Sequence, residues 1–121
     1  MDSEQLALLA AEACDDRKAV DIQLIQVEDV SSLADWFVIA GGLSDVQVRA
    51  IAASVEDRLE TIGRQPLRKE GIREGTWVLL DYGELIVHIL TPAERRYYDL
   101  ESFWAHGTRR PFLGSVESAA G

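Results

Sequence analysis

The sequence predicts an α/β fold with a mixed sheet of about five strands flanked by helices. Two observations predict this class. Segments with the three-and-four spacing of amphipathic helices alternate along the chain with short segments that have the two-residue period of strands. The chain has 121 residues, of which 47% are hydrophobic, so it is long enough to bury one core without disulfides or metals. Helices packed on a single sheet satisfy both observations.

The first three elements differ in the period of their apolar residues. From Ser3 to about Arg17 the apolar residues fall on one stripe, which predicts an amphipathic helix. The segment Ala19–Val27 alternates apolar and polar residues, as a half-buried strand does. From Trp36 to Ala40 every residue is apolar, which predicts a central strand that is covered on both faces.

A second helix is predicted to begin at Ser44. Gln47 follows three residues later, and in such a capping box the two side chains bond free backbone amides at the helix start. The apolar residues that follow keep to one helix face: Val48, Ile51, Ala52, Val55, Leu59 and Ile62. Gly63 suits the left-handed conformation in which helices commonly end.

Three strands and a helix are predicted in the second half. Pro66–Glu70 suits a short edge strand, because a proline removes a hydrogen-bond donor that an edge can spare. Trp77–Ile89 is predicted to form a hairpin. Thr91, Pro92 and Glu94 form a second capping box, which opens a helix through residues 97–104. Periodicity is lost after this helix, which divides the chain into a domain of residues 1–106 and a flexible tail of residues 107–121.

The predicted hairpin has one aliphatic face and one mixed face. A two-residue turn at residues 82–83 predicts three opposing pairs on the mixed face. These pairs are Trp77–His88, Leu79–Ile86 and Asp81–Glu84. The alternate positions are uniformly aliphatic and are predicted to face the core: Val78, Leu80, Leu85, Val87 and Ile89. An aromatic and aliphatic centre with a charged rim is typical of a protein-binding surface, and a covering helix of the same chain is the alternative interpretation.

The charge balance disfavours direct binding to nucleic acid. The chain has 21 acidic and 12 basic residues and a formal net charge of −9, which opposes approach to a phosphate backbone. An acidic surface instead suits a basic protein partner. The single cysteine, Cys14, predicts packing on a helix in a reducing compartment. Without a signal peptide or an apolar segment of about 20 residues, no membrane contact is expected and the chain is predicted to be cytoplasmic.

The remaining polar motifs give weak support for catalysis or cofactor binding. Gly41 and Gly42 lie between a predicted strand and a predicted helix, where free amides can hold an anion. A nucleotide-binding or nucleotidyltransferase-type enzyme that uses this turn is therefore the alternative function. It is the weaker interpretation, because the turn lacks the spacing of the dinucleotide and phosphate-binding motifs. His88 and His106 are the only histidines, which makes a metal cluster improbable. The sequence therefore predicts no enzyme activity, no cofactor and no metal.

Four stretches of the sequence resemble the ribosomal silencing factor family, RsfS, which is also called the Iojap-related family. The stretches are ADWFVIAGGLSDVQVRAIAASVEDRL, PLRKEG, GTWVLLDYGELIVHIL and ERRYYDLESFW. They occur in this order, and the similarity as a whole runs from about Leu6 to Trp104, which is most of the chain. The departures are small: Gly42 and Leu43 replace other small residues, Glu84 replaces aspartate, and Leu90 replaces an aromatic residue. Glu84 keeps the charge of the residue that it replaces.

The resemblance implies a fold of the nucleotidyltransferase-like kind without transferase activity, in a chain that is often homodimeric. It also implies binding to the large ribosomal subunit through its basic protein numbered fourteen, at the subunit interface. Steric exclusion of the small subunit would then repress translation. The family signature falls on residues 77, 81–84 and 88, with Tyr98, Asp99 and Glu101 from the last helix. The predicted partner-binding residues are Trp77, Leu79, Ile86 and His88 at the centre, Asp81 and Glu84 at the rim, and Tyr98.

Overall fold

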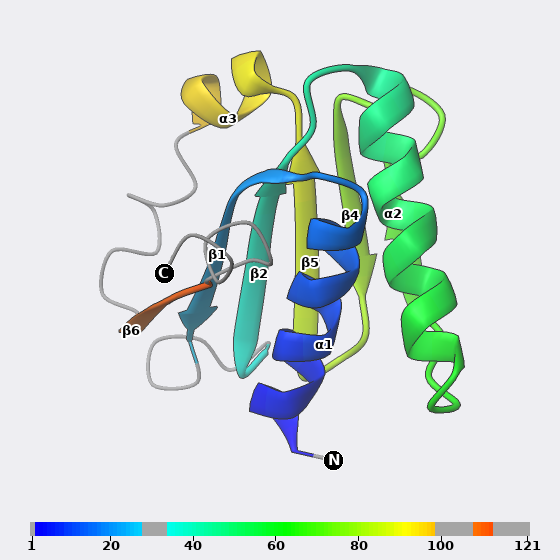
Figure 1. The fold of residues 1–121 in the computed structure, drawn as a ribbon, viewed down its shortest axis with the longest axis vertical. Helices are drawn as coiled ribbons and strands as arrows, with labels where there is room; N and C mark the ends of the chain where they lie inside the picture. Colours follow the sequence, from blue (N-terminus) through cyan, green and yellow to red (C-terminus); the bar gives the residue numbers. More distant parts are fainter. Residues whose placement is uncertain (1, 28–33, 99–107, 113–121) are drawn as a thin grey trace.

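The computed structural model describes residues 2–27, 34–98 and 108–112, which form a mixed six-stranded sheet with helices (Figure 1). The three helices are α1 (Ser3–Asp16), α2 (Asp45–Glu60) and α3 (Pro92–Tyr98). The six strands are β1 (Val20–Gln26), β2 (Trp36–Gly41), β3 (Arg68–Glu70), β4 (Trp77–Asp81), β5 (Leu85–Leu90) and β6 (Thr108–Pro111). The predicted α/β class and its mixed sheet are confirmed.

The two long helices begin at capping residues. Asp2 accepts a hydrogen bond from the backbone of Gln5, and the Gln5 side chain accepts one from the backbone of Asp2, which completes a capping box before α1. Ser44 accepts a hydrogen bond from the Gln47 amide, as the sequence predicts for α2. The Gln47 side chain bonds the amide of Leu43, so the second half of the predicted cap lies one residue earlier.

The strands lie in the order β3-β4-β5-β2-β1-β6. Strands β2 and β5 pair in parallel, and all other neighbours are antiparallel. Strand β2 is buried along its whole length, which confirms the predicted central strand. Strand β3 is exposed along its length and pairs only with β4, as expected for an edge.

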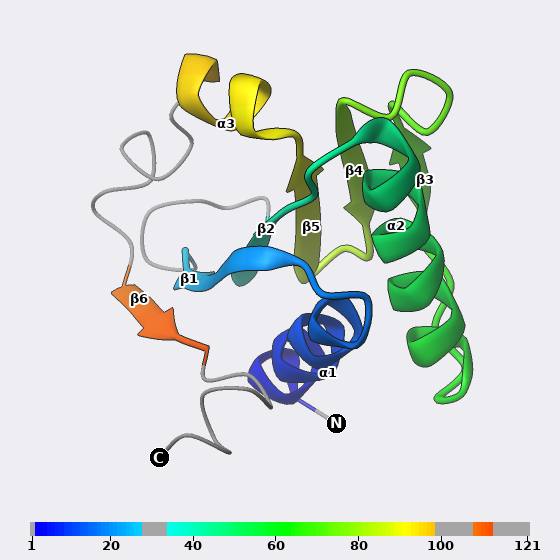
Figure 2. The ribbon, with the colours of Figure 1, turned by 45° about the horizontal axis from the view of Figure 1, so that its top comes forward.

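Both long helices cover the same face of the sheet. Helix α1 contacts β1, β2 and β5, and α2 contacts β4 and β5 (Figures 1 and 2). The main core lies between these helices and the sheet, and it includes the aliphatic positions of the predicted hairpin: Val78, Leu80, Leu85, Val87 and Ile89. Among the described residues, no helix combines the length and apolarity needed to cross a membrane.

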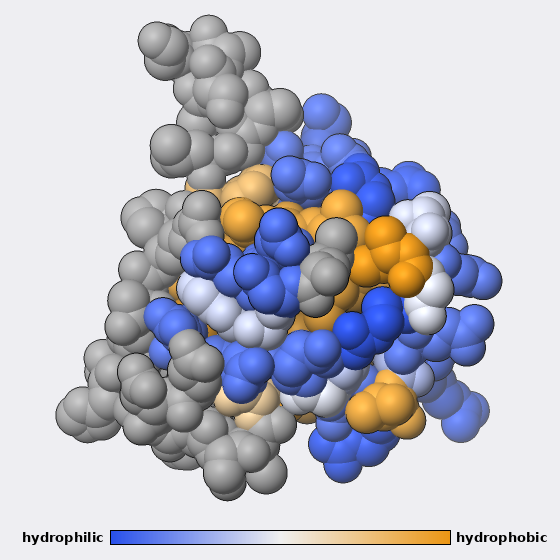
Figure 3. Space-filling view, turned by 90° about the horizontal axis from the view of Figure 1, so that it is seen from below, coloured by the Kyte–Doolittle hydropathy of each residue, from blue (hydrophilic) through white to orange (hydrophobic). Residues whose placement is uncertain are grey.

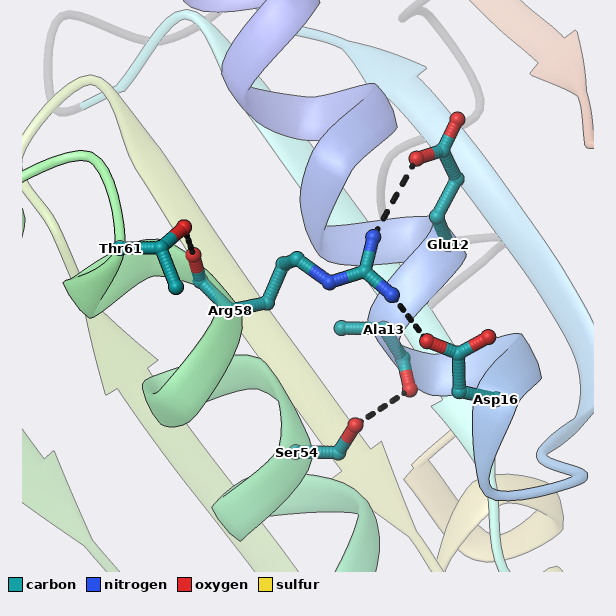
Figure 4. Close-up of polar contacts among 6 residues, drawn as sticks. All are labelled: Glu12, Ala13, Asp16, Ser54, Arg58 and Thr61. Atoms are coloured by element: carbon teal, nitrogen blue, oxygen red, sulfur yellow. Dashed lines mark hydrogen bonds and ion pairs between the residues drawn. The ribbon is translucent and has the colours of Figure 1, made fainter.

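Helices α1 and α2 are joined by polar contacts as well as by the core (Figure 4). The Ser54 hydroxyl donates a hydrogen bond to the carbonyl oxygen of Ala13 at 2.8 Å. The Arg58 guanidinium pairs with Asp16, and its Nη1 lies 3.5 Å from a carboxylate oxygen of Glu12. These charged groups come from the exposed surface where the two helices meet, so solvent weakens their attraction.

An Arg58→Met variant is therefore expected to lose at most about 1 kcal/mol of unfolding free energy. The loss should shrink as salt is added, since salt screens exposed charges. Urea denaturation at low and at high ionic strength measures both effects, with the exposed Arg73→Met variant as a control for removing one positive charge. An equal loss at both salt concentrations would show that the guanidinium contributes by packing.

The β4–β5 register differs from the predicted one by two residues. Trp77 pairs with Leu90, Leu79 with His88, and Asp81 with Ile86. The predicted two-residue turn at residues 82–83 is thus wrong, because Tyr82 donates its backbone N–H to the carbonyl oxygen of Leu85 and so moves the turn to residues 83–84. A shift by two preserves which side chains share a face, so the predicted separation of the faces holds.

The C-terminal segment also differs from the expected flexible tail. Thr108–Pro111 forms β6, which pairs antiparallel with residues Gln23–Gln26 of β1. Phe112 packs against the main core. Residues 113–121 lie outside the described part of the chain, as does the predicted continuation of the last helix beyond Tyr98. The sheet therefore gains a sixth strand from a stretch that shows no strand period.

Candidate protein-binding site

The sheet face turned away from α1 and α2 carries the mixed side of the β4–β5 hairpin. We call this surface the outer face. Strands β2, β4 and β5 bring its residues together by their pairing: Phe37, Ile39, Trp77, Leu79, Ile86, His88 and Leu90. It is mostly apolar, with His88 near its centre, so the predicted grouping of Trp77, Leu79, Ile86 and His88 is confirmed as a geometric fact.

Trp77 and His88 contact each other diagonally across the hairpin. In the observed register His88 is two positions from the residue opposite Trp77, a separation that an aromatic side chain can cross. The indole Nε1–H donates a hydrogen bond to Nδ1 of His88 at 3.2 Å. Phe37 lies on the other side of the imidazole, with the two ring centroids 5.1 Å apart. The imidazole is therefore held between two aromatic rings from neighbouring strands.

The hydrogen bond fixes the protonation of His88. An indole nitrogen can only donate, so Nδ1 must be an unprotonated acceptor and the proton of the neutral ring resides on Nε2. Burial lowers the pKa of His88 from 6.5 to about 4, which keeps the ring neutral near pH 7. Nε2 is buried, and no residue in the described part of the chain forms a hydrogen bond with it. His88 is thus a neutral, tautomerically fixed imidazole rather than a positive charge at the surface.

The predicted surface residues differ in their exposure. His88 is 6% exposed and Ile86 is 9% exposed, so both lie beneath the surface of the outer face. Trp77 and Leu79 of β4 are only half-buried. The part of the predicted centre that solvent reaches consists chiefly of Trp77 and Leu79, and the two β5 residues support them from within.

Glu84 is held by an arginine that sequence reasoning missed. Arg64 Nη2 lies 2.6 Å from Oε1 of Glu84, and Nη1 lies 3.1 Å from Oε2, which makes a two-pronged ion pair. Arg64 also donates to the carbonyl oxygen of Tyr82 at 2.9 Å. The hydrogen bond from Arg64 lowers the pKa of Glu84, and that bond in turn raises the pKa of Arg64. No sequence spacing indicates a pair between residues 20 positions apart.

Asp81 shapes the connection between β4 and β5. Its Oδ1 accepts the backbone N–H of Gly83 at 2.8 Å, the geometry in which an aspartate stabilises a turn. Its Oδ2 lies 3.7 Å from a nitrogen of Arg68 on the edge strand. Both predicted rim acids therefore have basic neighbours within the chain, which reduces the negative charge that they present to a partner.

The lower end of the molecule in Figure 1 contains this β4–β5 connection, and Figure 3 views that end directly. Hydrophobic residues lie in the middle of the view, with hydrophilic residues around much of them. The exposed side chain of Leu67 lies beside the β4–β5 connection. Its Cδ1 is close to Gly83, since a Cβ built on that glycine would lie 3.5 Å from it. The surface beside the predicted rim is consequently more apolar than the two acids alone indicate.

The other predicted groups are located as follows. Tyr98 is the last residue of α3, and Asp99 and Glu101 lie outside the described residues. Cys14 is fully buried on α1, where burial raises the pKa of its thiol to about 12, so packing is its observed role. The described part of the chain contains no group of three or more His, Cys, Asp or Glu side chains placed to hold a metal ion.

Packing accounts for the two glycines of the alternative nucleotide site. A Cβ on Gly41 would lie 2.9 Å from a methyl carbon of Val20, and one on Gly42 would lie 2.8 Å from a methyl carbon of Val48. Both distances are too short for a real side chain. Small residues are thus required here for the close approach of β2 to its neighbours, whether or not an anion binds.

Comparisons with known proteins agree with the fold and with the resemblance. The model of the RsfS family, described as ribosomal silencing factor during starvation, matches residues 1–120. Ribosomal silencing factor RsfS of Bacillus subtilis is 42% identical over 104 residues, which are 86% of this chain and 88% of the relative. Protein Iojap, a chloroplastic protein of Zea mays, is 31% identical over 105 residues, which are 84% of this chain and 44% of that protein.

A solved structure gives the same result. The crystal structure of a Chromobacterium violaceum protein superposes with a TM-score of 0.85 at 38% identity, covering 93% of this chain and 92% of that one. The family match extends over nearly the whole chain, and the sequence identities are high enough to show family membership as well as a shared fold. The chain therefore belongs to the RsfS family of ribosomal silencing factors.

Proposed function

We propose that the chain binds the large ribosomal subunit through the ribosomal protein numbered fourteen of that subunit. The bound chain then blocks joining of the small subunit by steric exclusion and represses translation. In this proposal it acts in the cytoplasm and catalyses no reaction. The observation that carries the proposal is the half-buried pair Trp77 and Leu79, which solvent reaches on the outer face of a chain from the RsfS family.

The geometry of the outer face supports a protein partner. Interfaces are enriched in tryptophan at their centres, where a large rigid ring contributes contact area at little cost in side-chain entropy. Trp77 and Leu79 lie two positions apart on β4, so they project from the same side of the sheet. Their neighbours Ile86 and His88 are buried, so Trp77 and Leu79 pack against fixed side chains.

Charge supports the choice of a basic partner. The chain has a net charge of −9, so its overall field favours encounter with a positively charged protein and disfavours nucleic acid. Asp81 and Glu84 remain proposed rim residues, with their charge partly offset by Arg68 and Arg64. Tyr98 of α3 is retained as a proposed contact, and a homodimer is proposed as the free form on the basis of the resemblance.

A Trp77→Ala variant is expected to bind large subunits at least about thirtyfold more weakly, equivalent to about 2 kcal/mol. Truncation removes the indole, the large half-buried aromatic side chain of the outer face. Cosedimentation of large subunits with the variant over a concentration series measures the change. The same variant should no longer slow the association of the two subunits, as followed by light scattering.

Leu43→Ala is the matched control for this experiment. Leu43 is 68% exposed, stands just before α2 and is not among the residues of the outer face, so its truncation should leave binding unchanged. Circular dichroism must show that Trp77→Ala is folded. Full retention of binding by Trp77→Ala would contradict the site, whereas a wild-type chain that binds no large subunits would contradict the partner.

A further inference from the structure

The Trp77–His88 hydrogen bond joins a half-buried residue to a buried one. Trp77 is half-buried on β4, and His88 is 94% buried on β5 between the rings of Phe37 and Trp77. Burial and the neighbouring Phe37 ring, whose centroid lies 5.1 Å from that of the imidazole, restrict rotation of the imidazole. Nδ1 is therefore a fixed acceptor, and the indole that donates to it is oriented by a buried group.

We infer that His88 is a positioning residue: its Nδ1 holds the indole of Trp77 in the one orientation that the proposed docking surface uses. This inference rests on the proposed function, since it assigns the role of a residue within that surface. His88 acts through Trp77, because its own side chain lies beneath the surface. The contact of 3.2 Å between Nε1 and Nδ1 is the link between them.

The burial of Nε2 favours this role over simple packing. A neutral histidine that accepts at Nδ1 must place its proton on Nε2, and here that nitrogen is buried with no hydrogen-bond partner among the described residues. An unpaired buried donor reduces stability, so a leucine of similar size would serve a purely structural role better. The acceptor that Nδ1 provides for the indole of Trp77 accounts for a histidine at this position.

Orientation of the indole matters for binding because a free side chain must be ordered when a partner docks. Ordering one side chain at an interface weakens affinity by about two- to tenfold. A His88→Leu variant removes the acceptor and keeps apolar volume, so it should bind large subunits about two- to tenfold more weakly while remaining at least as stable as the wild type. His88→Asn offers an amide oxygen close to the position of Nδ1 and should restore much of the affinity.

Nuclear magnetic resonance tests the hydrogen bond without the ribosome. The chain has three tryptophans, and the indole N–H signal of Trp77 is identified by its loss in Trp77→Phe. In the wild type and in His88→Asn that proton should exchange slowly with water, and in His88→Leu it should exchange faster. Unchanged exchange in His88→Leu would show that the bond is absent in solution and would overturn the inference.

A double-mutant cycle tests the role in docking. Trp77→Phe removes the donor and keeps most of the ring, so combining it with His88→Leu should weaken binding no more than the stronger single change. Additive losses, or a His88→Leu variant that binds like the wild type, would overturn the positioning role. If the wild type does not bind large subunits, the proposed function fails, and the exchange experiment still reports on the hydrogen bond.

Discussion

Replacement of Gly71 by alanine is expected to lower the free energy of unfolding by about 3 kcal/mol or more. Gly71 is the first residue of the loop between β3 and β4 and has a φ of +80°, a conformation that residues with a Cβ rarely adopt. A Cβ at this position would overlap the carbonyl oxygen of Trp77 and lie 3.0 Å from its carbonyl carbon. Backbone cannot rotate away as a side chain can, so the start of β4 must move.

Gly63→Ala provides the matched control. Gly63 has a similar φ of +78°, but a Cβ there would meet no atom within 4 Å. Its replacement should cost only the backbone strain, about 1 kcal/mol. Urea denaturation of both variants separates strain from overlap, and equal losses would contradict the overlap. If Gly71→Ala remains folded, it should also bind large subunits weakly, because the displaced residue is Trp77.

Acidification is expected to destabilise the protein through His88. Burial disfavours the charged form of His88 and lowers its pKa from the ordinary histidine value of 6.5 to about 4 in the folded chain. The unfolded chain therefore binds a proton at a higher pH than the folded chain does. Stability from this group is complete above pH 6.5 and falls as the pH drops towards 4. The expected loss is about 2 kcal/mol at pH 5 and about 3 kcal/mol below pH 4.

Comparison with His88→Leu isolates this effect from the titration of acidic groups. Both proteins contain the Arg64–Glu84 ion pair, in which Arg64 lowers the pKa of Glu84. Protonation of Glu84 in acid weakens this pair in both proteins, so its effect cancels in the comparison. The difference in unfolding free energy between wild type and variant, measured by urea denaturation from pH 7.5 to 4.5, should change by about 2 kcal/mol or more. A difference that stays constant over this range would show that His88 does not titrate with folding.

Local signals in the sequence predicted most of the regular elements correctly. Helix α2 was predicted from its cap at Ser44 and its apolar stripe, and both depend on residues within a few turns of each other. The unbroken apolar run of β2 predicted a strand buried on both faces. The two faces of the β4–β5 hairpin were predicted from their alternation, which survives a register shift of two residues.

Contacts between distant segments were not predictable in the same way. Strand β6 has no strand period of its own, and it exists through hydrogen bonds to β1 that span more than 80 positions of the chain. The β4–β5 register depends on a backbone bond between Tyr82 and Leu85, which side-chain patterns do not encode. The Arg64–Glu84 pair likewise depends on where the end of α2 meets the β4–β5 connection.

The sequence alone determined the family, the α/β class and the outer face as a group of residues, because periodicity and motifs are properties of neighbours along the chain. Only the tertiary structure decided which side chains of that face solvent reaches and which charges are paired. It buried Ile86 and His88, left Trp77 and Leu79 half-exposed, and offset the charge of Asp81 and Glu84 with two arginines. Burial and ion pairing depend on which distant atoms fill the space around a side chain, and packing alone settles that.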